Sequence, residues 1–164
     1  MKRKTLYAVL LSCIMLGACT LASDIPSTPT LPNVSLPVAG SEETWNSADY
    51  EGKPILLSIM SSGCPWCRRS IAALDVANET FAGQVEVVGV FIDDVPADVE
   101  AVQKEFQMKT KALYYGEELA TDMEVNGLPA IFLFDKKHRL VKVWGGYSDT
   151  LANEYKAAIN KLLK

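Results

Sequence analysis

The sequence contains little histidine, little cysteine and no excess of basic residues. There is one histidine, His138, and there are four cysteines among 164 residues. A closed zinc site needs about four ligands, so a site built mainly on imidazole groups is excluded. The formal net charge of −4 argues against a nucleic-acid partner and against electrostatic attraction to an acidic membrane surface. We therefore expect proteins as the main partners.

No apolar run is long enough to cross a bilayer, but the N-terminus has the features of an export signal. Basic residues at positions 2–4 precede an apolar run over residues 6–16, which is shorter than the roughly 20 residues of a membrane-spanning helix. The run ends in LGAC, residues 16–19, which resembles a bacterial lipobox, in which the cysteine is acylated and becomes the first residue after cleavage. The alternative is an ordinary signal peptide that contains a cysteine.

Acylation of Cys19 would give the protein a stable membrane anchor. Several acyl chains on one residue supply the double signal that lasting attachment needs. We therefore expect residues 1–18 to be a lipoprotein signal peptide and the mature protein to be exported and membrane-anchored, facing the periplasm or the cell exterior. Loss of residues 1–18 removes Cys13 and three positive charges, which would change the net charge from −4 to −7. One cysteine pair, Cys64 and Cys67, then remains for chemistry.

Residues 19–40 are expected to form a lipidated, proline-rich tether. Between residues 24 and 37 the sequence reads DIPSTPTLPNVSLP and has no apolar periodicity, which is typical of an extended, partly polyproline linker. The alternative is an ordered arm that lies across the domain. Residues 41–164 suit a single domain that can bury a core without disulfide bonds.

The domain alternates between strand-like and helix-like segments. Short apolar or alternating runs predict strands, with a four-residue hairpin turn before the last one, over residues 55–60, 85–92, 112–115, 130–134 and 139–144. Apolar spacings of three and four predict helices over residues 64–82, 97–106 and 149–163, with a weaker one over 117–123. This order predicts an α/β fold with a central mixed β-sheet flanked by helices on both faces.

The stretch SSGCPWCRRS, residues 61–70, holds two cysteines three positions apart. Four kinds of site fit such a pair: a structural disulfide, a zinc site, a Cu(I) site and a redox-active dithiol. A disulfide across so short a loop restrains the unfolded chain little, and the mature chain has too few further ligands for zinc. The pair therefore favours thiol-disulfide exchange, with Cu(I) binding as an open alternative.

The predicted helix gives the two cysteines different roles. Cys64 lies at its N-terminus, where unpaired backbone N–H groups and the helix dipole stabilise a thiolate and lower its pKa. Pro65 suits the first helical position because the helix has no use for the N–H that proline lacks. Cys67 lies one turn further in, where burial should leave it the higher pKa of a resolving thiol. A redox-active disulfide between Cys64 and Cys67 thus serves in place of a bound cofactor, and we expect no metal.

Other side chains allow two interpretations each. Trp66 either faces the substrate or covers the disulfide. Arg68 and Arg69 either act on the site, by favouring the thiolate or steering an acidic partner, or are solvated. His138 falls in the predicted hairpin turn, where we expect a surface position. Residues 93 and 94, both aspartates, follow a strand and are expected to cap the next helix rather than to bind a cation.

Three stretches carry a family resemblance: EGKPILLSIMSSGCPWC (51–67), VEVVGVFIDD (85–94) and VNGLPAIFLFDKKHRLVKVWGG (125–146). Together they resemble the thioredoxin superfamily, and specifically the membrane-anchored TlpA/ResA-like thiol-disulfide oxidoreductases. The resemblance implies a thioredoxin-like fold, protein thiol or disulfide substrates and a membrane redox donor. It also implies that Pro129 is a cis-proline whose loop packs against the cysteines, and that Leu128, with Pro65 and Trp66, contacts the substrate.

Three positions depart from the family pattern. Gly63 replaces a tryptophan that thioredoxins have, Ser58 a buried acid of thioredoxin, and Ser70 a glutamate of ResA-like proteins. No proton acceptor for Cys67 is therefore identified. The proline-aromatic pair between the cysteines resembles glutaredoxins, whose potentials are less reducing than that of thioredoxin. We expect a reductase or isomerase rather than an oxidase; the alternative is a copper-binding or partner-docking lipoprotein without catalytic turnover.

Overall fold

The computed structural model of the protein describes residues 28–93 and 95–164. Its central sheet has five strands: β3 (Ile55–Met60), β4 (Glu86–Phe91), β5 (Lys111–Leu113), β6 (Ala130–Phe134) and β7 (Leu140–Gly145). Their order in the sheet is β5-β4-β3-β6-β7. The β3-β4 and β4-β5 pairs are parallel, whereas the β3-β6 and β6-β7 pairs are antiparallel. The predicted mixed sheet is confirmed.

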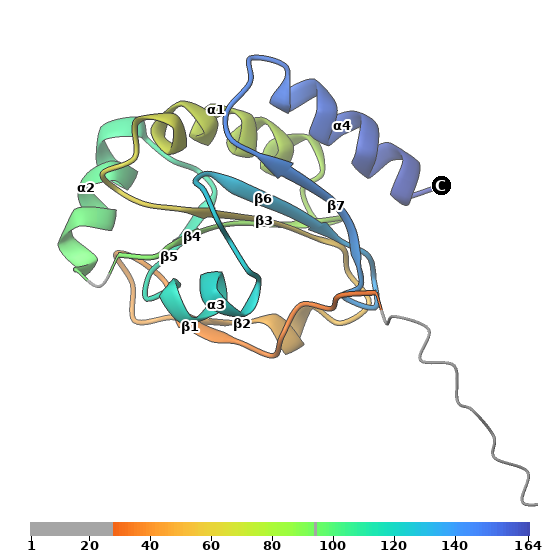
Figure 1. The fold of residues 1–164 in the computed structure, drawn as a ribbon, viewed down its shortest axis with the longest axis horizontal. Coiled ribbons are helices and arrows are strands. Elements are labelled where there is room, and N and C mark those ends of the chain that lie inside the picture. Colours follow the sequence, from red (N-terminus) through yellow and green to blue (C-terminus); the bar gives the residue numbers. More distant parts are fainter. Residues whose placement is uncertain (1–27, 94) are drawn as a thin grey trace, which may run out of the picture.

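Helices cover both faces of this sheet. They are α1 (Pro65–Thr80), α2 (Pro96–Phe106), α3 (Glu117–Asp122) and α4 (Leu151–Leu162). Figure 1 shows α1 and α4 side by side over one face and α3 beneath the other. The predicted α/β class and thioredoxin-like fold are confirmed. Within the described part of the chain, no helix has both the length and the apolar character needed to cross a membrane.

The alternation of side chains along β3 creates two cores. All six residues of β3 are buried, as expected for a central strand between two covering layers. Leu56 and Met60 pack in the core beneath α1, α2 and α4. Leu57 and Ile59 point the opposite way and pack in the core that includes Leu119 of α3. The strand is therefore held from both sides, and so is the position at which it ends.

The stretch expected to be an extended tether is an ordered arm from residue 28 onward. The N–H of Leu31 donates to the carbonyl oxygen of His138 at 2.9 Å. Further on, β1 (Ser35–Pro37) pairs antiparallel with β2 (Thr44–Asn46). The prediction of a free linker is wrong for this part, because its apolar residues cover the sheet face that α3 leaves open. The predicted signal peptide, Cys19 and the start of the tether lie outside the described residues.

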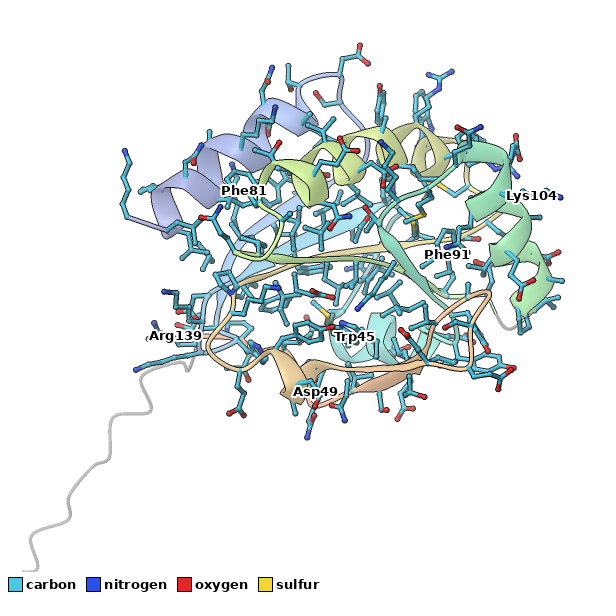
Figure 2. The ribbon with its side chains drawn as sticks, turned by 180° about the vertical axis from the view of Figure 1, so that it is seen from behind. Trp45, Asp49, Phe81, Phe91, Lys104 and Arg139 are labelled. Atoms are coloured by element: carbon cyan, nitrogen blue, oxygen red, sulfur yellow. The ribbon has the colours of Figure 1, made fainter. Side chains whose placement is uncertain are left out.

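A buried carboxylate fastens the arm to the sheet. The indole N–H of Trp45, on β2, donates to Glu86 of β4 at 3.3 Å. Lys53 and Lys111 each lie 3.6 Å from the same carboxylate, so this buried charge is paired. Figure 2 shows the Trp45 side chain between the arm and the sheet. These contacts fix the arm to the end of the sheet that lies opposite to Met60, the last residue of β3.

We expect the arm to contribute to stability as a core element does. Replacing Leu36 with Ala should lower the free energy of unfolding by about 2–5 kcal/mol, because Leu36 is 6% exposed and a cavity would remain. Its exposed neighbour Ser35 is the control, and Ser35→Ala should change stability by no more than about 0.5 kcal/mol. Urea denaturation of the purified proteins measures both. Equal, small effects would show that the arm does not pack in solution.

Candidate active site

The end of β3 delivers Cys64 to the start of α1. Cys64 is the N-cap of this helix, with extended backbone angles (φ −85°, ψ 113°) and Pro65 immediately after it. Its Sγ atom accepts a hydrogen bond from the N–H of Cys67 at 3.2 Å. Helix N-termini have N–H groups without helical partners, and here a sulfur occupies the place that a serine or aspartate oxygen usually takes. An ionised sulfur would strengthen this bond.

Cys67 lies in the first turn of α1 and is almost inaccessible, with 1% of its surface exposed. Burial, followed by the hydrogen bond with Cys64, raises the pKa of the Cys67 thiol far above its usual range. The negative charge of Asp93 acts in the same direction, whereas a hydrogen bond from the backbone of Ser61 opposes it. Both cysteines are free thiols in the structure.

A second segment reaches Cys64 from the far part of the chain. Leu128 and Pro129 precede β6, and the peptide bond between them is cis. The Cys64 thiol points at the carbonyl oxygen of Leu128, with 3.9 Å between the sulfur and the oxygen. Because β6 runs antiparallel to β3, the start of β6 lies beside the end of β3. The structure thus brings Cys64, Cys67, Leu128 and Pro129 together, and their catalytic and binding roles stay predictions.

The loop before Cys64 is held from two sides. Asp93 accepts hydrogen bonds from the backbone N–H of Ser62, at 2.9 Å, and from its hydroxyl. The Nε of Arg68 donates to the carbonyl oxygen of Ser62 at 3.0 Å, and the same guanidinium lies 3.5 Å from Glu105 of α2. Arg68 is therefore neither a solvated cation nor directed at the thiolate. It joins the loop to α2.

The prediction that Asp93 caps the next helix is wrong. The N-cap of α2 is Val95, and among the described residues no side chain caps this helix. Asp93 bonds to Ser62 instead, a contact that sequence analysis missed. The sequence does contain a signal for it, because β3 and β4 are adjacent parallel strands and the residues after such strands meet at one edge of the sheet. Residue 94 lies outside the described residues.

Trp66 is exposed beside the cysteines rather than covering them. Its side chain is 53% exposed. The ring stacks on Tyr147 with 6.1 Å between centroids, and the guanidinium of Arg69 lies 4.8 Å from the ring centroid. Arg69 is thus placed over an aromatic face rather than toward the sulfur atoms. Trp66, Tyr147 and Arg69 form a surface patch that a bound protein could contact, which favours the substrate-facing interpretation of Trp66.

The positions that depart from the family pattern supply no carboxylate near Cys67. The hydroxyl of Ser70 donates to the carbonyl oxygen of Cys67 at 2.7 Å, within the helix. The buried hydroxyl of Ser58 has no hydrogen-bond partner among residues 28–93 and 95–164. The carboxylate that raises the pKa of the Cys67 thiol is instead that of Asp93.

His138 lies at the opposite end of the sheet from the cysteines. It follows β6, whose last residue, Phe134, pairs with Ile55 at the beginning of β3. The Nε2 atom of His138 is 3.1 Å from the carbonyl oxygen of Tyr50. In the part of the chain that the structure describes, no three His, Cys, Asp or Glu side chains are grouped as metal ligands. His138 therefore cannot join the two thiolates in one metal site in this fold.

Comparisons with known proteins agree with this geometry. The sequence model of the AhpC/TSA family matches residues 29–150. No curated protein sequence gives a significant match.

Solved structures of thiol-disulfide interchange and thioredoxin proteins share the fold. A candidate thiol:disulfide interchange protein DsbE from Chlorobium tepidum superposes with a TM-score of 0.77 at 18% identity, covering 84% of this chain and 98% of its own. The thioredoxin domain of a thiol-disulfide oxidoreductase from Bacteroides vulgatus gives 0.71 at 19%, covering 80% and 96%. The exposed lipoprotein thioredoxin of Streptococcus pneumoniae gives 0.68 at 22%, covering 80% and 98%.

Family and fold agree with the predicted enzyme class, a thioredoxin-like oxidoreductase. The family match extends over well more than half of the sequence, including the arm, both cysteines and the Leu128-Pro129 segment. The chain therefore belongs to the AhpC/TSA family.

Proposed function

We propose that this protein is an exported, lipid-anchored oxidoreductase that exchanges disulfides with protein substrates, Cys64 being the nucleophile and Cys67 the resolving thiol. The proposal includes Cys19 as the lipidated residue and an electron donor in the membrane. The export signal and the lipobox-like LGAC sequence support export and lipid anchoring. The fold shared with an exposed lipoprotein thioredoxin is consistent with it.

One observation carries the proposal: the two sulfur atoms have opposite environments although their residues are three positions apart. Cys64 is partly exposed and its sulfur accepts an N–H bond from the helix. Cys67 is buried and its pKa is raised. An accessible sulfur can attack an incoming disulfide, and a protected thiol can wait until the mixed disulfide exists.

The exchange then proceeds in two balanced steps. The Cys64 thiolate attacks one sulfur of a substrate disulfide, and the other substrate sulfur leaves as a thiolate that takes up a proton. Cys67 then loses its proton and attacks the Cys64 sulfur, which forms the Cys64-Cys67 disulfide and releases the second substrate thiol. The substrate gains two electrons in this direction, so a dithiol donor must reduce the protein again. In isomerisation the substrate itself completes the cycle and no net electrons are needed.

Replacing Cys67 with Ala should trap the first intermediate. Cys64 can still attack, but no thiol is left to resolve the mixed disulfide, so a disulfide-linked adduct with substrate proteins should accumulate. Non-reducing electrophoresis and mass spectrometry of the protein purified from cells after acid quenching would identify it. The Cys64→Ala, Cys67→Ala double variant is the control and should give no adduct. Absence of any adduct, with both thiols of the unmodified protein permanently oxidised, would instead support a structural disulfide.

The resolving step should depend steeply on pH. Only the thiolate of Cys67 attacks, and its pKa is raised, so release of substrate from the mixed disulfide should accelerate about tenfold per unit between about pH 6 and pH 9. Asp93→Asn keeps one acceptor oxygen for Ser62 but removes a charge that raises the Cys67 pKa, so this profile should move to lower pH. Asp93→Ala, which also loses the bonds to Ser62, separates charge from loop position. Stopped-flow single-turnover measurements test this, and a plateau near neutral pH in the unmodified protein would contradict it.

The reduction potential should identify the direction of exchange. For a reductase or isomerase with a proline-aromatic pair between its cysteines, we expect about −230 to −180 mV, the range of glutaredoxins and protein disulfide isomerase. Equilibration with glutathione buffers, followed by thiol alkylation, measures it. A value near −120 mV, as in a strong oxidant, would contradict the proposed direction but not the exchange itself.

A further inference from the structure

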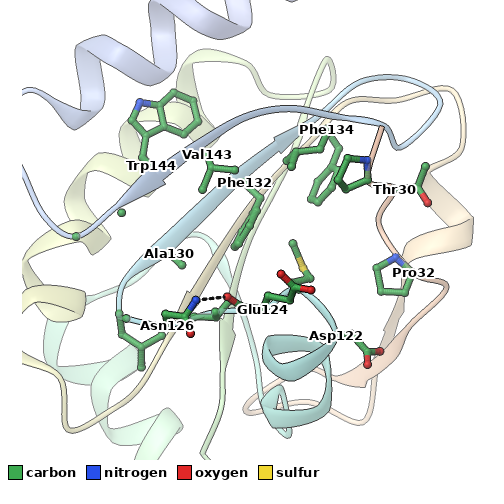
Figure 3. A pocket seen from close by; sticks show the side chains of 18 residues that line it. Thr30, Pro32, Asp122, Glu124, Asn126, Ala130, Phe132, Phe134, Val143 and Trp144 are labelled. Carbon is green, nitrogen blue, oxygen red and sulfur yellow. Dashed lines mark hydrogen bonds between the residues drawn. The ribbon is translucent and has the colours of Figure 1, made fainter. Parts of the chain in front are cut away.

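A groove of about 700 Å³ lies on the sheet face opposite to α1 and α4. Its walls are the arm around Pro29–Pro32 and the segment from Asp122 to Leu128. Figure 3 looks into it, with Phe132, Phe134 and Val143 on the floor and the Trp144 side chain directed away on the other face of β7. The floor is apolar and consists of Ala130, Phe132, Phe134, Leu140 and Val143. Its size is typical of binding sites for organic ligands.

One end of the groove reaches the reactive sulfur. Leu128 lines the groove, and its carbonyl oxygen is the atom that faces Cys64 Sγ at 3.9 Å. Gly146 also lines it, and the N–H of Gly146 donates to the carbonyl oxygen of Pro129 at 2.8 Å. A polypeptide bonded to Cys64 can therefore pass over Leu128 and place its neighbouring side chains in the groove.

The mouth of the groove carries negative charge. Asp122 and Glu124 line it and are exposed, and Figure 3 shows both beside the opening. No Lys, Arg or His is among the lining residues, and in the described parts of the chain neither carboxylate forms an ion pair. The charge at the mouth is therefore available to a cation on the occupant, in a site whose floor favours apolar side chains.

We propose that this groove selects the substrate: it binds a protein segment in which an apolar side chain and a lysine or arginine lie near the reactive cysteine. This inference rests on the proposed disulfide exchange and adds the class of segment that is exchanged. The apolar side chain packs on Phe132 and Val143, and the basic side chain meets Asp122 and Glu124. A peptide occupant is favoured over a free small molecule because the groove begins at the residue that contacts Cys64, where a substrate cysteine must lie.

This proposal is tested by measuring how fast the reduced protein exchanges disulfides with synthetic substrates. Three probes are cysteine peptides, each supplied as a mixed disulfide with glutathione. In the first the cysteine has Leu and Lys as neighbours, in the second Ser and Lys, and in the third Leu and Glu. Hydroxyethyl disulfide is the small reference substrate. We expect the Leu and Lys peptide to react about 10- to 100-fold faster than the Ser and Lys peptide, the ratio for burial of one large apolar side chain. It should also react several-fold faster than the Leu and Glu peptide, and this difference should shrink as salt is added.

Two pairs of variants assign the preference to the groove. Val143→Asp should reduce the ratio of the Leu and Lys peptide rate to the hydroxyethyl disulfide rate about 10-fold or more. Val141→Asp is the matched control, since Val141 is equally exposed on β7 (50% against 48%) but does not line the groove. Asp122→Asn with Glu124→Gln should remove the preference for Lys over Glu. Glu117→Gln with Glu118→Gln changes the same charge on α3 outside the groove and should retain that preference.

The outcomes separate this inference from the function it rests on. Exchange with hydroxyethyl disulfide but equal rates for all peptides, or equal effects of Val143→Asp and Val141→Asp, would overturn the groove assignment and leave the exchange function intact. Equal peptide rates together with a dimer that Val143→Asp disrupts would assign the groove to a second copy of this chain and also overturn it. Absence of exchange with every disulfide in the unmodified protein would overturn the proposed function and this inference together.

Discussion

The backbone N–H groups at the start of α1 constrain the whole reactive end of the molecule. They have no helical acceptors, and the sulfur of Cys64 accepts one of them. This bond exists only if Cys64 stands outside the helix with extended backbone angles while Pro65 begins the helix. Both conditions depend on where β3 ends, and β3 is fixed because all its residues are buried between two cores. The position of one sulfur atom is thus determined by the packing of the complete sheet.

The difference between the two thiols comes from burial and from the helix end, not from the two arginines that follow them. Arg68 is paired with Glu105 and holds the carbonyl oxygen of Ser62, and Arg69 lies over Trp66. Burial is the main reason why the pKa of Cys67 is raised, and the interactions with Cys64 and then the negative charge of Asp93 raise it further. One short loop therefore places an accessible sulfur beside a protected thiol, although the two residues are only three positions apart.

Much of the fold followed from local pattern, and the parts that did not depend on contacts distant in sequence. The apolar runs of β3 and β4 and the periodicity of α1 and α4 predicted these elements to within about two residues. The arm escaped prediction because Leu31 and Leu36 are separated by prolines and polar residues with no period, and their burial depends on a sheet face formed much later in the chain. Asp93 was misassigned for the same reason, since its partner Ser62 lies 31 positions away.

Leu128 connects the chemistry to the surface that we propose selects substrates. Its side chain packs against both cores, its carbonyl oxygen faces Cys64, and it lines the groove. A segment bound in the groove therefore rests on a residue whose position is fixed from both faces of the sheet. This limits how far the substrate sulfur can be displaced from the geometry needed for attack by Cys64. The arm completes this arrangement, because Pro29 and Pro32 form a wall of the groove while Leu31 anchors to the turn at His138. The segment that sequence analysis assigned to tethering is thus part of the surface that a substrate would contact.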